Sequence, residues 1–522
     1  MNALKWHRVC LVLICLALLS VTTVGTVKAD PALQGETDFA AIDAYVTEQV
    51  SNLRIPGMAL GIVEGSQIAH LQGFGVADST GRAVTPQTPF NLGSLTKSFT
   101  ALAVMQLVEA GQIDLNAPVQ TYLPWFALAD KDASARITVR HLLNNTSGIS
   151  TKDGNRFWPS QQGLEETVRG LDKIQLTQPV GTSYQYCNIN FMIAGLIVEV
   201  VSGQSYADYV TERIYRPLDM RHSYASRAPA LADGLAERYH YMFGQVFRDE
   251  GPMPPSFLPA GFLIASVEDM THYAIAHLDD GRYGDTSILS PQGMAELHTP
   301  AISQAGDKYY AMGWEIGTVD GVSAIWHTGD DSRIHSVIIL MPDRGSGVIL
   351  LANATGFEQQ SQVDDTAVGV FRVLNGKAAA RVSLPIGRRL QYWALLLTPL
   401  LQILGILVVW WNRQRIKGWG GVLAVILNLA VVFVLFRVSL QIITLPSMLV
   451  YYPELGYSLI VIATLGIGWS VYFTVMYLIK MNKTGCLVFQ RDSLFFSTPT
   501  RAQLSVRRAV GRQFQSSHPQ AG

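Results

Sequence analysis

The chain has 522 residues, of which 49% are apolar and 15% charged, and its formal net charge is −1. A chain of this length can form two to four domains, each large enough to bury a core. The balanced charge argues against a nucleic-acid partner, because proteins recognise nucleic acids with clustered basic surfaces.

The first 29 residues have the organisation of a secretory signal peptide. Lys5 and Arg8 precede an apolar run over residues 9–19, and small residues ending at Ala29 follow it. This order of basic, apolar and small residues is typical of export signals. We therefore expect residues 1–29 to be a cleaved signal peptide and the body that follows to be exported. The alternative is that the segment remains as an N-terminal anchor.

The cysteines and histidines predict neither a disulfide nor a metal site in the exported body. Cys187 is the one cysteine between the signal segment and the apolar C-terminal region, so the body cannot form an internal disulfide. The eleven histidines show no paired metal-ligand spacing, and His272 and His277 do not share a helical face. We expect no metal and no cofactor.

The body begins with a predicted helix over residues 38–53, and the segments "GMALGIVEG" and "QIAHLQGFGVAD" then predict a hairpin. Helical segments and loops occupy the middle. Near the end, "YYAMGWEIG", "VSAIWHTG", "HSVIILMP" and "SGVILLAN" predict four strands, followed by a helix over residues 358–374. Short turns join antiparallel neighbours. The predicted fold class is α+β, an antiparallel sheet covered by terminal helices, with a helical region inserted after the first hairpin.

Three long runs without charged residues follow the body. They cover residues 390–412, 418–436 and 455–479, and each approaches the ~20 residues that cross a bilayer as a helix. Soluble helices rarely remain uncharged over such lengths. We therefore expect a membrane region with three transmembrane helices over residues 390–480, joined to the body by a linker over residues 376–389.

The segments that flank these runs predict their orientation. Basic residues crowd the loop "NRQRIKG" and the C-terminal segment, whereas "PSMLVYYPELG" contains Glu454 and neither Lys nor Arg. Basic loops remain on the cytoplasmic side of a membrane. We expect a multi-pass protein of the cell membrane, with a basic cytoplasmic tail over residues 481–522 and the body outside the cytoplasm.

The stretch "NLGSLTKSFTALAVMQLVEAG" places Ser94 and Lys97 on one face of a predicted core helix. A serine hydroxyl is a weak nucleophile unless a base accepts its proton, and a desolvated lysine can be that base. This spacing alone is weak, because it occurs about twice by chance in a chain of this length. Two later patterns strengthen it, namely Tyr186-Cys187-Asn188 before a predicted helix and His327-Thr328-Gly329 at the end of a predicted strand.

In this order, the three patterns resemble the serine β-lactamase and penicillin-binding-protein superfamily, specifically its class C type branch of β-lactamase-related serine hydrolases. Supporting stretches are "ITVRHLLNNTSGIS", "PAGFLIASVEDM" and "HTGDDSRIHSVIILMPDRGSGVILLAN", and the resemblance covers about residues 38–375. The combination is specific, although each pattern alone is not. It implies a β-lactamase/transpeptidase-like fold for a serine hydrolase domain over residues 30–375.

The expected catalytic residues are Ser94, Lys97 and Tyr186. Ser94 would be the nucleophile and Lys97 its base, with Tyr186 as a second proton carrier. Asn188 would hold Lys97 and the amide of the substrate. Four further substrate-binding residues are expected at the end of the last motif, and they are His327, Thr328, Gly329 and Asp330.

The resemblance implies an oxyanion hole formed by the backbone N–H groups of Ser94 and Asp330. A glycine at position 329 would let the strand approach the substrate closely.

Several positions depart from the family pattern. His327 stands where many relatives have a lysine, and Asp330 and Asp331 stand where glycines are common. Carboxylate substrates need a cationic partner, so an acidic mouth predicts a preference for uncharged esters or amides, with Arg333 at most neutralising the aspartates. Phe262, in place of a small residue, predicts a narrowed cleft.

We therefore expect a membrane-anchored extracytoplasmic serine hydrolase that works through an acyl-enzyme, as an esterase, a D-amino-acid peptidase or a β-lactamase-like enzyme. Its expected partners are a small-molecule or peptide substrate and the membrane lipid bilayer, with no nucleic acid; the oligomeric state is left open. One alternative is a penicillin-binding-type sensor that is acylated without turnover and signals through the membrane helices. Another is a catalytically inactive binding domain.

Overall fold

The computed structural model of the chain describes residues 38–495, except 158, 159, 358, 380, 381, 383–385, 412–417, 441 and 442. The predicted signal peptide lies outside the described residues, as does most of the predicted tail. The chain divides into two compact units. The body unit contains residues up to 397 together with 437–459, and the helical unit contains residues 398–436 together with those from 460 onward.

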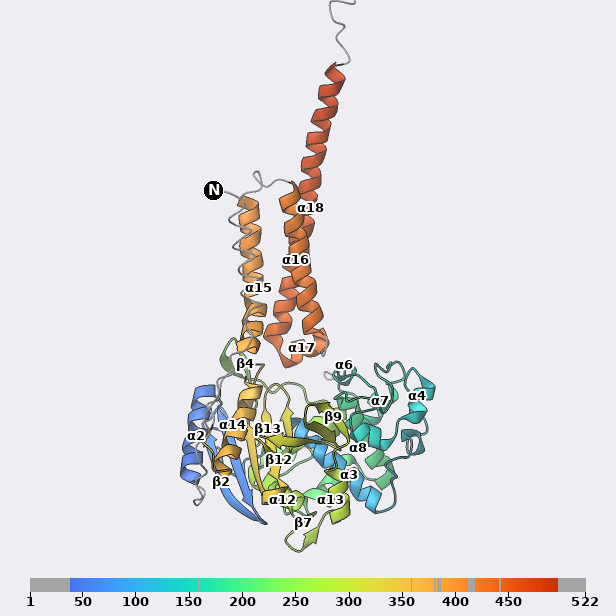
Figure 1. Ribbon diagram of the computed structural model, residues 1–522, viewed down its shortest axis with the longest axis vertical. Helices are drawn as coiled ribbons and strands as arrows, with labels where there is room; N and C mark the ends of the chain where they lie inside the picture. The colour runs from blue at the N-terminus through green and yellow to red at the C-terminus, as the bar shows by residue number, and fades with distance from the viewer. Residues whose placement is uncertain are drawn as a thin grey trace, which may run out of the picture. The chain divides into compact units, whose positions relative to one another are not determined.

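The body unit is built on an eight-stranded antiparallel sheet with the strand order β2-β1-β14-β13-β12-β11-β10-β9 (Figure 1). Strand β1 of the first hairpin pairs with β14, the last strand of the sheet. A largely helical region is inserted along the chain between this hairpin and the remaining strands, as the sequence predicts. The strands are β1 (Gly57–Glu64), β2 (Gln67–Gly75), β9 (Ile302–Ala305), β10 (Lys308–Ala311), β11 (Trp314–Val319), β12 (Val322–Asp330), β13 (His335–Met341) and β14 (Ser346–Ala352).

Helices surround this sheet, and short strands pair outside it. The body-unit helices are α2 (Phe39–Leu53), α3 (Thr96–Glu109), α4 (Lys131–Arg136), α5 (Val139–Leu143), α6 (Thr151–Gly154), α7 (Leu164–Arg169), α8 (Asn188–Ser202), α9 (Tyr206–Val210), α10 (Arg227–Ala232), α11 (Leu258–Gly261), α12 (Val267–Leu278), α13 (Pro291–Leu297), α14 (Gln360–Leu374) and α17 (Leu445–Tyr451). The short strands are β3 (Phe90–Asn91) with β6 (Ile264–Ala265), β7 (Arg282–Tyr283) with β8 (Thr286–Ser287), and β4 (Tyr239–Met242) between β15 (Ala354–Thr355) and β5 (Gln245–Arg248).

The central strands are buried on both faces, which explains their nearly continuous apolar sequences. Side chains alternate between the two faces of a strand. Leu60 packs in one core with Ile42 of α2 and Val370 of α14, whereas its neighbour Ala59 belongs to the core that contains Met270 of α12. Figure 1 shows α2 and α14 on one side of the sheet and α12 on the other. The predicted α+β arrangement with terminal helices over the sheet is therefore confirmed.

Helix α3 lies in the second core and is buried almost all round. Every residue from Thr96 to Met105 is buried, because α8, α11 and α13 pack around this helix. A helix that is enclosed on every side offers no route to water for a side chain in its first turn.

The sequence prediction missed the edge strand β9 and was wrong at one further strand. "YYAMGWEIG" is not a single strand, because the chain reverses between Ala311 and Trp314 and forms the antiparallel pair β10 and β11. Gly313 at this turn has a φ of +80°, and a Cβ there would lie 2.8 Å from the carbonyl oxygen of Lys97. The chain reverses at a single glycine inside an apolar run. The residue pattern from which strands are predicted therefore shows no break at this turn.

Two glycines let β12 touch the segment that precedes α3. A Cβ on Gly329 would lie 1.9 Å from the carbonyl oxygen of Leu92, and one on Gly93, whose φ is +54°, would lie 2.6 Å from the backbone nitrogen of Asp330. The hydroxyl of Ser336 also donates to the Leu92 carbonyl at 2.6 Å. These contacts hold the start of α3 against the end of β12.

The helical unit contains most of three apolar helices, α15 (Ile386–Trp411), α16 (Gly418–Ser439) and α18 (Pro453–Phe495). Two segments of the described chain are long and apolar enough to cross a membrane, Val422–Ser439 and Pro453–Ile479. Helix α15 contributes a shorter apolar segment, Tyr392–Val408. Two membrane-crossing helices are thus supported, and the third stays a prediction.

Polar side chains join the three helices of this unit. Gln402 donates from Nε2 to Asn428 Oδ1 at 3.1 Å and to the Ile462 carbonyl at 3.2 Å. Asn428 donates from Nδ2 to the Gly466 carbonyl at 2.8 Å and to Ser470 Oγ at 3.1 Å. Hydrogen bonds of this kind help apolar helices associate where the hydrophobic effect does not.

The contact between β12 and the start of α3 makes a testable prediction. In Gly329→Ala, the new methyl group meets the Leu92 carbonyl, and overpacking of this kind costs about 1–3 kcal/mol. We expect a lower midpoint of thermal unfolding, together with slower modification of Ser94 by a serine-reactive probe. The matched control is Gly170→Ala, where a Cβ makes only ordinary contacts and the expected change is within about 0.5 kcal/mol. Equal behaviour of the two variants would contradict the proposed role of the contact.

Candidate active site

Ser94 lies on a 3₁₀ turn, Gly93–Leu95, immediately before α3. Its side chain is half-buried and lines a pocket of about 530 Å³. Lys97 follows in the first turn of α3 and is completely buried. The structure therefore brings the two residues together on one helical face, inside the protein.

The amine of Lys97 is surrounded by three oxygen atoms. Its Nζ lies 3.0 Å from Ser94 Oγ, 2.8 Å from Asn188 Oδ1 and 2.6 Å from the carbonyl oxygen of Ala260. Asn188 opens α8, and Ala260 belongs to α11. Three separate helices thus converge on one nitrogen atom.

The surroundings of this amine favour its neutral form. Burial lowers the pKa of Lys97 well below its ordinary value. A neutral amine has two N–H donors and one lone pair, and the oxygens of Asn188 and Ala260 can only accept hydrogen bonds. If both N–H groups donate to those oxygens, the lone pair faces the Ser94 hydroxyl. This is the arrangement that a general base requires.

A second asparagine fixes the orientation of Asn188. Asn188 donates from Nδ2 to Asn155 Oδ1 at 3.0 Å, so its own Oδ1 is directed at Lys97. The assignment of the two amide atoms follows from this network of partners. Asn155 was missed in the sequence, because it belongs to no motif and lies at the end of the four-residue helix α6.

Tyr186 precedes α8 and lies beside the same amine, with Lys97 Nζ 4.8 Å from the centre of its ring. Burial raises the pKa of Tyr186 well above its usual value, and a hydrogen bond from the Ser94 side chain opposes that increase. The hydroxyl is therefore protonated at neutral pH. In that form it can supply a proton but cannot act as the resting base.

His327 lies in β12 and is buried. Burial and the neighbouring Lys97 lower its pKa to about 3, against a hydrogen bond to the Thr328 carbonyl. Nδ1 lies 2.6 Å from that carbonyl oxygen and must carry the hydrogen, which leaves Nε2 as an acceptor 3.5 Å from the Tyr310 hydroxyl. His327 thus contributes no charge to the pocket at pH 7.

The expectation that Asp330 and Asp331 stand unpaired at the mouth is wrong, because each has a cationic partner. Asp331 forms a buried ion pair with Arg238, with Nη1 2.6 Å from Oδ2. Asp330 Oδ2 lies 3.2 Å from Nδ1 of His335, whose Nε2 lies 2.7 Å from Asp364 Oδ1. Burial alone would lower the pKa of His335, but the carboxylates of Asp364 and Asp330 raise it to about 10.

Arg333 does not neutralise these aspartates, although the sequence places it beside them. Its guanidinium instead pairs with Asp249, with Nη2 2.7 Å from Oδ2. The actual partners, Arg238 and His335, were missed because neither belongs to a motif. Arg238 and Asp331 are 93 residues apart along the chain, so no local sequence pattern indicates that they form an ion pair.

Phe262 does not narrow the cleft, although the sequence predicts that it would. It is buried in the same core as α3 and is not among the described residues that line the pocket. Its neighbours Ala260 and Gly261 line the pocket instead. The cleft is therefore not narrowed by this side chain.

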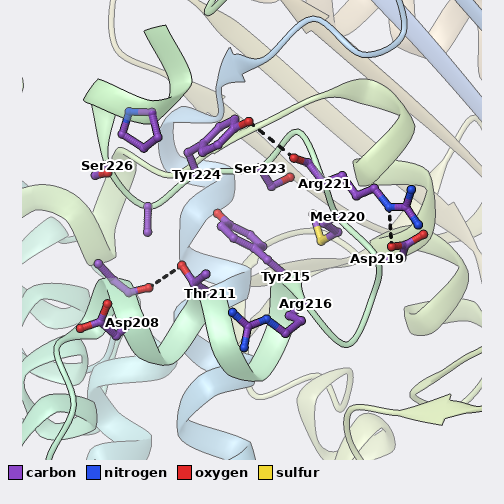
Figure 2. A pocket seen from close by; sticks show the side chains of 13 residues that line it. Asp208, Thr211, Tyr215, Arg216, Asp219, Met220, Arg221, Ser223, Tyr224 and Ser226 are labelled. Atoms are coloured by element: carbon purple, nitrogen blue, oxygen red, sulfur yellow. Dashed lines mark hydrogen bonds and ion pairs between the residues drawn. The ribbon is translucent and has the colours of Figure 1, made fainter. Parts of the chain in front are cut away.

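A second hollow of about 410 Å³ lies near the loop between Asp219 and α10 (Figure 2). Arg221 Nε donates to Asp219 Oδ1 at 2.8 Å, and the Tyr224 hydroxyl donates to Asp233 Oδ2 at 2.8 Å, so these polar groups already have partners. None of the site residues predicted from the sequence lines this hollow. The pocket at Ser94 remains the candidate active site.

The described part of the chain contains no group of three or more His, Cys, Asp and Glu side chains arranged to hold a metal ion.

A comparison with protein families matches residues 42–371 to the family described as Beta-lactamase. The matched segment is more than half of the chain and contains all three motifs. The chain belongs to the beta-lactamase family. The class C type branch that the sequence suggests is finer than this match and stays a prediction.

Individual relatives agree with this assignment. Penicillin-binding protein 4 of Amycolatopsis lactamdurans is 31% identical over 352 residues, which cover 65% of this chain and 88% of that protein. Unguisins hydrolase ungD' of Aspergillus campestris is 29% identical over 341 residues, or 61% of this chain. Protein flp of Staphylococcus aureus is 26% identical over 322 residues, or 60% of this chain. The chain spans only 62% of the length of each of the last two relatives.

A solved structure has the same fold. The octameric penicillin-binding protein homologue from Pyrococcus abyssi superposes with a TM-score of 0.60 at 26% sequence identity, and the match covers 69% of this chain and 81% of that chain. This beta-lactamase family chain therefore has the β-lactamase/transpeptidase-like fold that the motifs imply.

The state of Lys97 predicts the pH dependence of Ser94 acylation. Only the neutral amine can accept the serine proton, so the rate falls as pH decreases through the pKa of Lys97. Because burial lowers that pKa, we expect a plateau well before pH 10, whereas a lysine at its reference pKa of about 10.4 would still be titrating there. The measurement is the second-order rate of labelling by a serine-reactive probe between pH 5 and 10.

His327→Asn is the control for this profile. Since the pKa of His327 is about 3, removing the imidazole should leave the shape of the profile unchanged above pH 5. A rate that rises continuously to pH 10 in the wild type would contradict the neutral state of Lys97.

Proposed function

We propose that this chain is a serine hydrolase that cleaves an ester or amide through an acyl-enzyme, with Ser94 as nucleophile and Lys97 as its base. Family membership supports hydrolase chemistry in general. The single observation that carries the specific assignment is the position of Lys97 Nζ, 3.0 Å from Ser94 Oγ and held by two further acceptors.

The proposed reaction has two steps. In the first, Lys97 takes the hydroxyl proton, Ser94 Oγ bonds to the carbonyl carbon, and the bond to the leaving oxygen or nitrogen breaks as that atom gains a proton, with Tyr186 as the proposed donor. Before the second step, the proton on Lys97 passes to Tyr186, which restores the neutral amine and the tyrosine hydroxyl. In the second step, water attacks the acyl carbon and Lys97 takes its proton, the bond from that carbon to Ser94 Oγ breaks, and Ser94 Oγ regains its hydrogen from Lys97 as the carboxylic acid leaves.

The backbone N–H groups of Ser94 and Asp330 are the proposed oxyanion hole. The close approach of Gly93 and Gly329 supports this assignment, because it holds the two backbone segments side by side. Thr328 and Asn188 line the same pocket and are the proposed contacts to the substrate.

We infer that the reacting group of the substrate is uncharged. The described residues that line the pocket include no Lys or Arg, Lys97 favours its neutral form, and His327 is neutral at pH 7. A carboxylate bound there would lack the charge-assisted hydrogen bonds that make such recognition strong. The preference expected from the sequence is therefore retained, and the reason is the lack of Lys and Arg among the described lining residues.

We further propose that the chain is anchored in the cell membrane through its apolar helices, with the hydrolase domain of residues 30–375 outside the cytoplasm. Two helices of suitable length and composition support the anchoring. The basic loop "NRQRIKG" and the basic tail support the orientation.

The nucleophile is tested by covalent labelling with a fluorophosphonate probe. We expect Ser94→Ala to be unlabelled and Lys97→Met to be labelled at least about a hundredfold more slowly, because loss of a general base typically costs a factor of 10²–10⁴. The matched control is Ser323→Ala, which removes an exposed hydroxyl from β12 and should be labelled like the wild type. Labelling of Ser94→Ala at the wild-type rate would refute the assignment.

Turnover separates the hydrolase from the sensor alternative. With excess p-nitrophenyl ester, a hydrolase releases many equivalents of p-nitrophenol per protein, whereas a sensor releases one and stops at the acyl-enzyme.

Membrane orientation is tested separately. A reporter fused after residue 522 should be active in the cytoplasm, and protease added outside intact cells should release the body by cleavage near the 376–389 linker. Protection of the body from external protease would place it on the other side of the membrane.

A further inference from the structure

The lining of the pocket at Ser94 combines polar and apolar side chains. Polar members such as Tyr186, Asn188 and Thr328 come from the hydrolase domain. Aliphatic members come from far along the chain, from α15, from the last turn of α16, from the start of α18 and from the loop that contains α17. We call these aliphatic members the wall residues, and they are Leu395, Val438, Ile443, Met448 and Leu455.

The wall residues are part of the body unit. Residues 437–459 form one compact unit with the hydrolase domain. Aromatic side chains also line the pocket. Phe357 makes an edge contact with Tyr452 at a ring separation of 5.7 Å. The pocket is therefore enclosed by this loop segment as well as by the sheet and its helices.

One polar contact ties the loop segment to the residues around Lys97. Ser447 in α17 donates from Oγ to the carbonyl oxygen of Asn155 at 2.7 Å. Asn155 is the residue that orients Asn188, and Asn188 in turn holds Lys97. The loop thus contacts the site on the side of the base.

Two more contacts tie the segment to the other side of the site, next to β12. Arg333 donates from Nη2 to the carbonyl oxygen of Val450 at 3.0 Å. His240 Nε2 lies 3.1 Å from Glu454 Oε2, and both side chains are 1% exposed. Buried polar groups with specific partners fix one arrangement of the chain. These contacts hold the loop segment in place, so the wall residues are a fixed part of the pocket.

The chemistry of the wall indicates what it binds. The wall residues and the neighbouring aromatic side chains provide apolar surface in the same pocket as Ser94. The pocket has a volume of about 530 Å³, which lies within the range of roughly 300–1,000 Å³ typical of small-molecule sites. Helices α16 and α18 continue from the wall into segments apolar enough to cross a membrane. The wall residues on α16 and α18 therefore adjoin, along the chain, segments that would lie among lipids.

We propose that the wall residues bind the hydrocarbon chain of an amphiphilic ester or amide that resides in the lipid bilayer, with its acyl carbonyl at Ser94. The inference rests on the proposed function, because it names the substrate class of the same site. Ser94 Oγ bonds to the carbonyl carbon, the bond from that carbon to the alcohol oxygen or amine nitrogen breaks, and the alcohol or amine leaves with a proton. Water then releases the fatty acid.

The first test compares chain lengths, using the full chain in phosphatidylcholine vesicles. Each buried methylene favours binding by roughly fourfold, so kcat/KM for p-nitrophenyl octanoate should exceed that for the acetate by at least about tenfold. Ile443→Trp adds bulk among the wall residues and should lower the octanoate-to-acetate ratio at least tenfold. Leu445→Trp adds the same bulk two residues away, at a side chain outside the pocket lining, and should preserve the wild-type ratio.

The outcomes separate this inference from the function on which it rests. If the acetate is hydrolysed in a Ser94-dependent manner but the ratio is near one, or is unchanged in Ile443→Trp, the acyl-chain pocket is refuted and the hydrolase is retained. If neither ester is hydrolysed and Ser94 is not labelled, the proposed function itself fails.

The second test asks whether the substrate arrives from the bilayer. p-Nitrophenyl palmitate is placed either in the vesicles that carry the protein or in separate vesicles. We expect hydrolysis at least tenfold faster when protein and ester share a vesicle. Equal rates in the two arrangements would overturn entry from the bilayer.

Discussion

A lysine amine kept away from water determines how the site of this protein is built. Leaving such a group without partners in the interior is costly, so the chain must supply oxygen atoms from several directions. The side chain of Ser94, the opening residue of α8 and the carbonyl of Ala260 in α11 provide them. The turn at Gly313 closes against the backbone of Lys97 itself. Any loosening of these elements would readmit water and allow the amine to become charged.

Ion pairs at the end of β12 lie close to the buried amine of Lys97. Asp330 and Asp331 follow the proposed oxyanion-hole segment directly, yet each is matched by a buried partner, His335 and Arg238. Breaking a buried pair by removing one partner costs about 3–5 kcal/mol, so these side chains resist displacement. This pairing reduces the negative charge beside the proposed oxyanion hole, which suits a developing oxyanion.

The sequence predicts the parts of this structure that depend on local pattern. Short motifs and their order identify the residues that meet at Ser94. Alternation identifies the outer hairpin and most strands of the sheet, apart from the short edge strand β9 and the reversal at Gly313. It cannot reveal partners that lie far apart along the chain and belong to no motif. Arg238 is such a case, and so is Ser447, whose contact with Asn155 depends on how a loop between two apolar helices folds back. The acidic mouth was mistaken for the same reason, since charge counted along the chain omits partners met only in space.

The enclosure of the pocket by residues from the apolar C-terminal region bears on how inhibitors would be found. A fragment ending after α14 would keep Ser94, Lys97 and Tyr186 and would lack Leu395, Ile443 and the other members of the wall. Its site would open directly to solvent on that side. Compounds selected against such a fragment would be optimised for a solvent-exposed groove. Their order of affinity would differ for the intact chain, where the wall residues line the same groove.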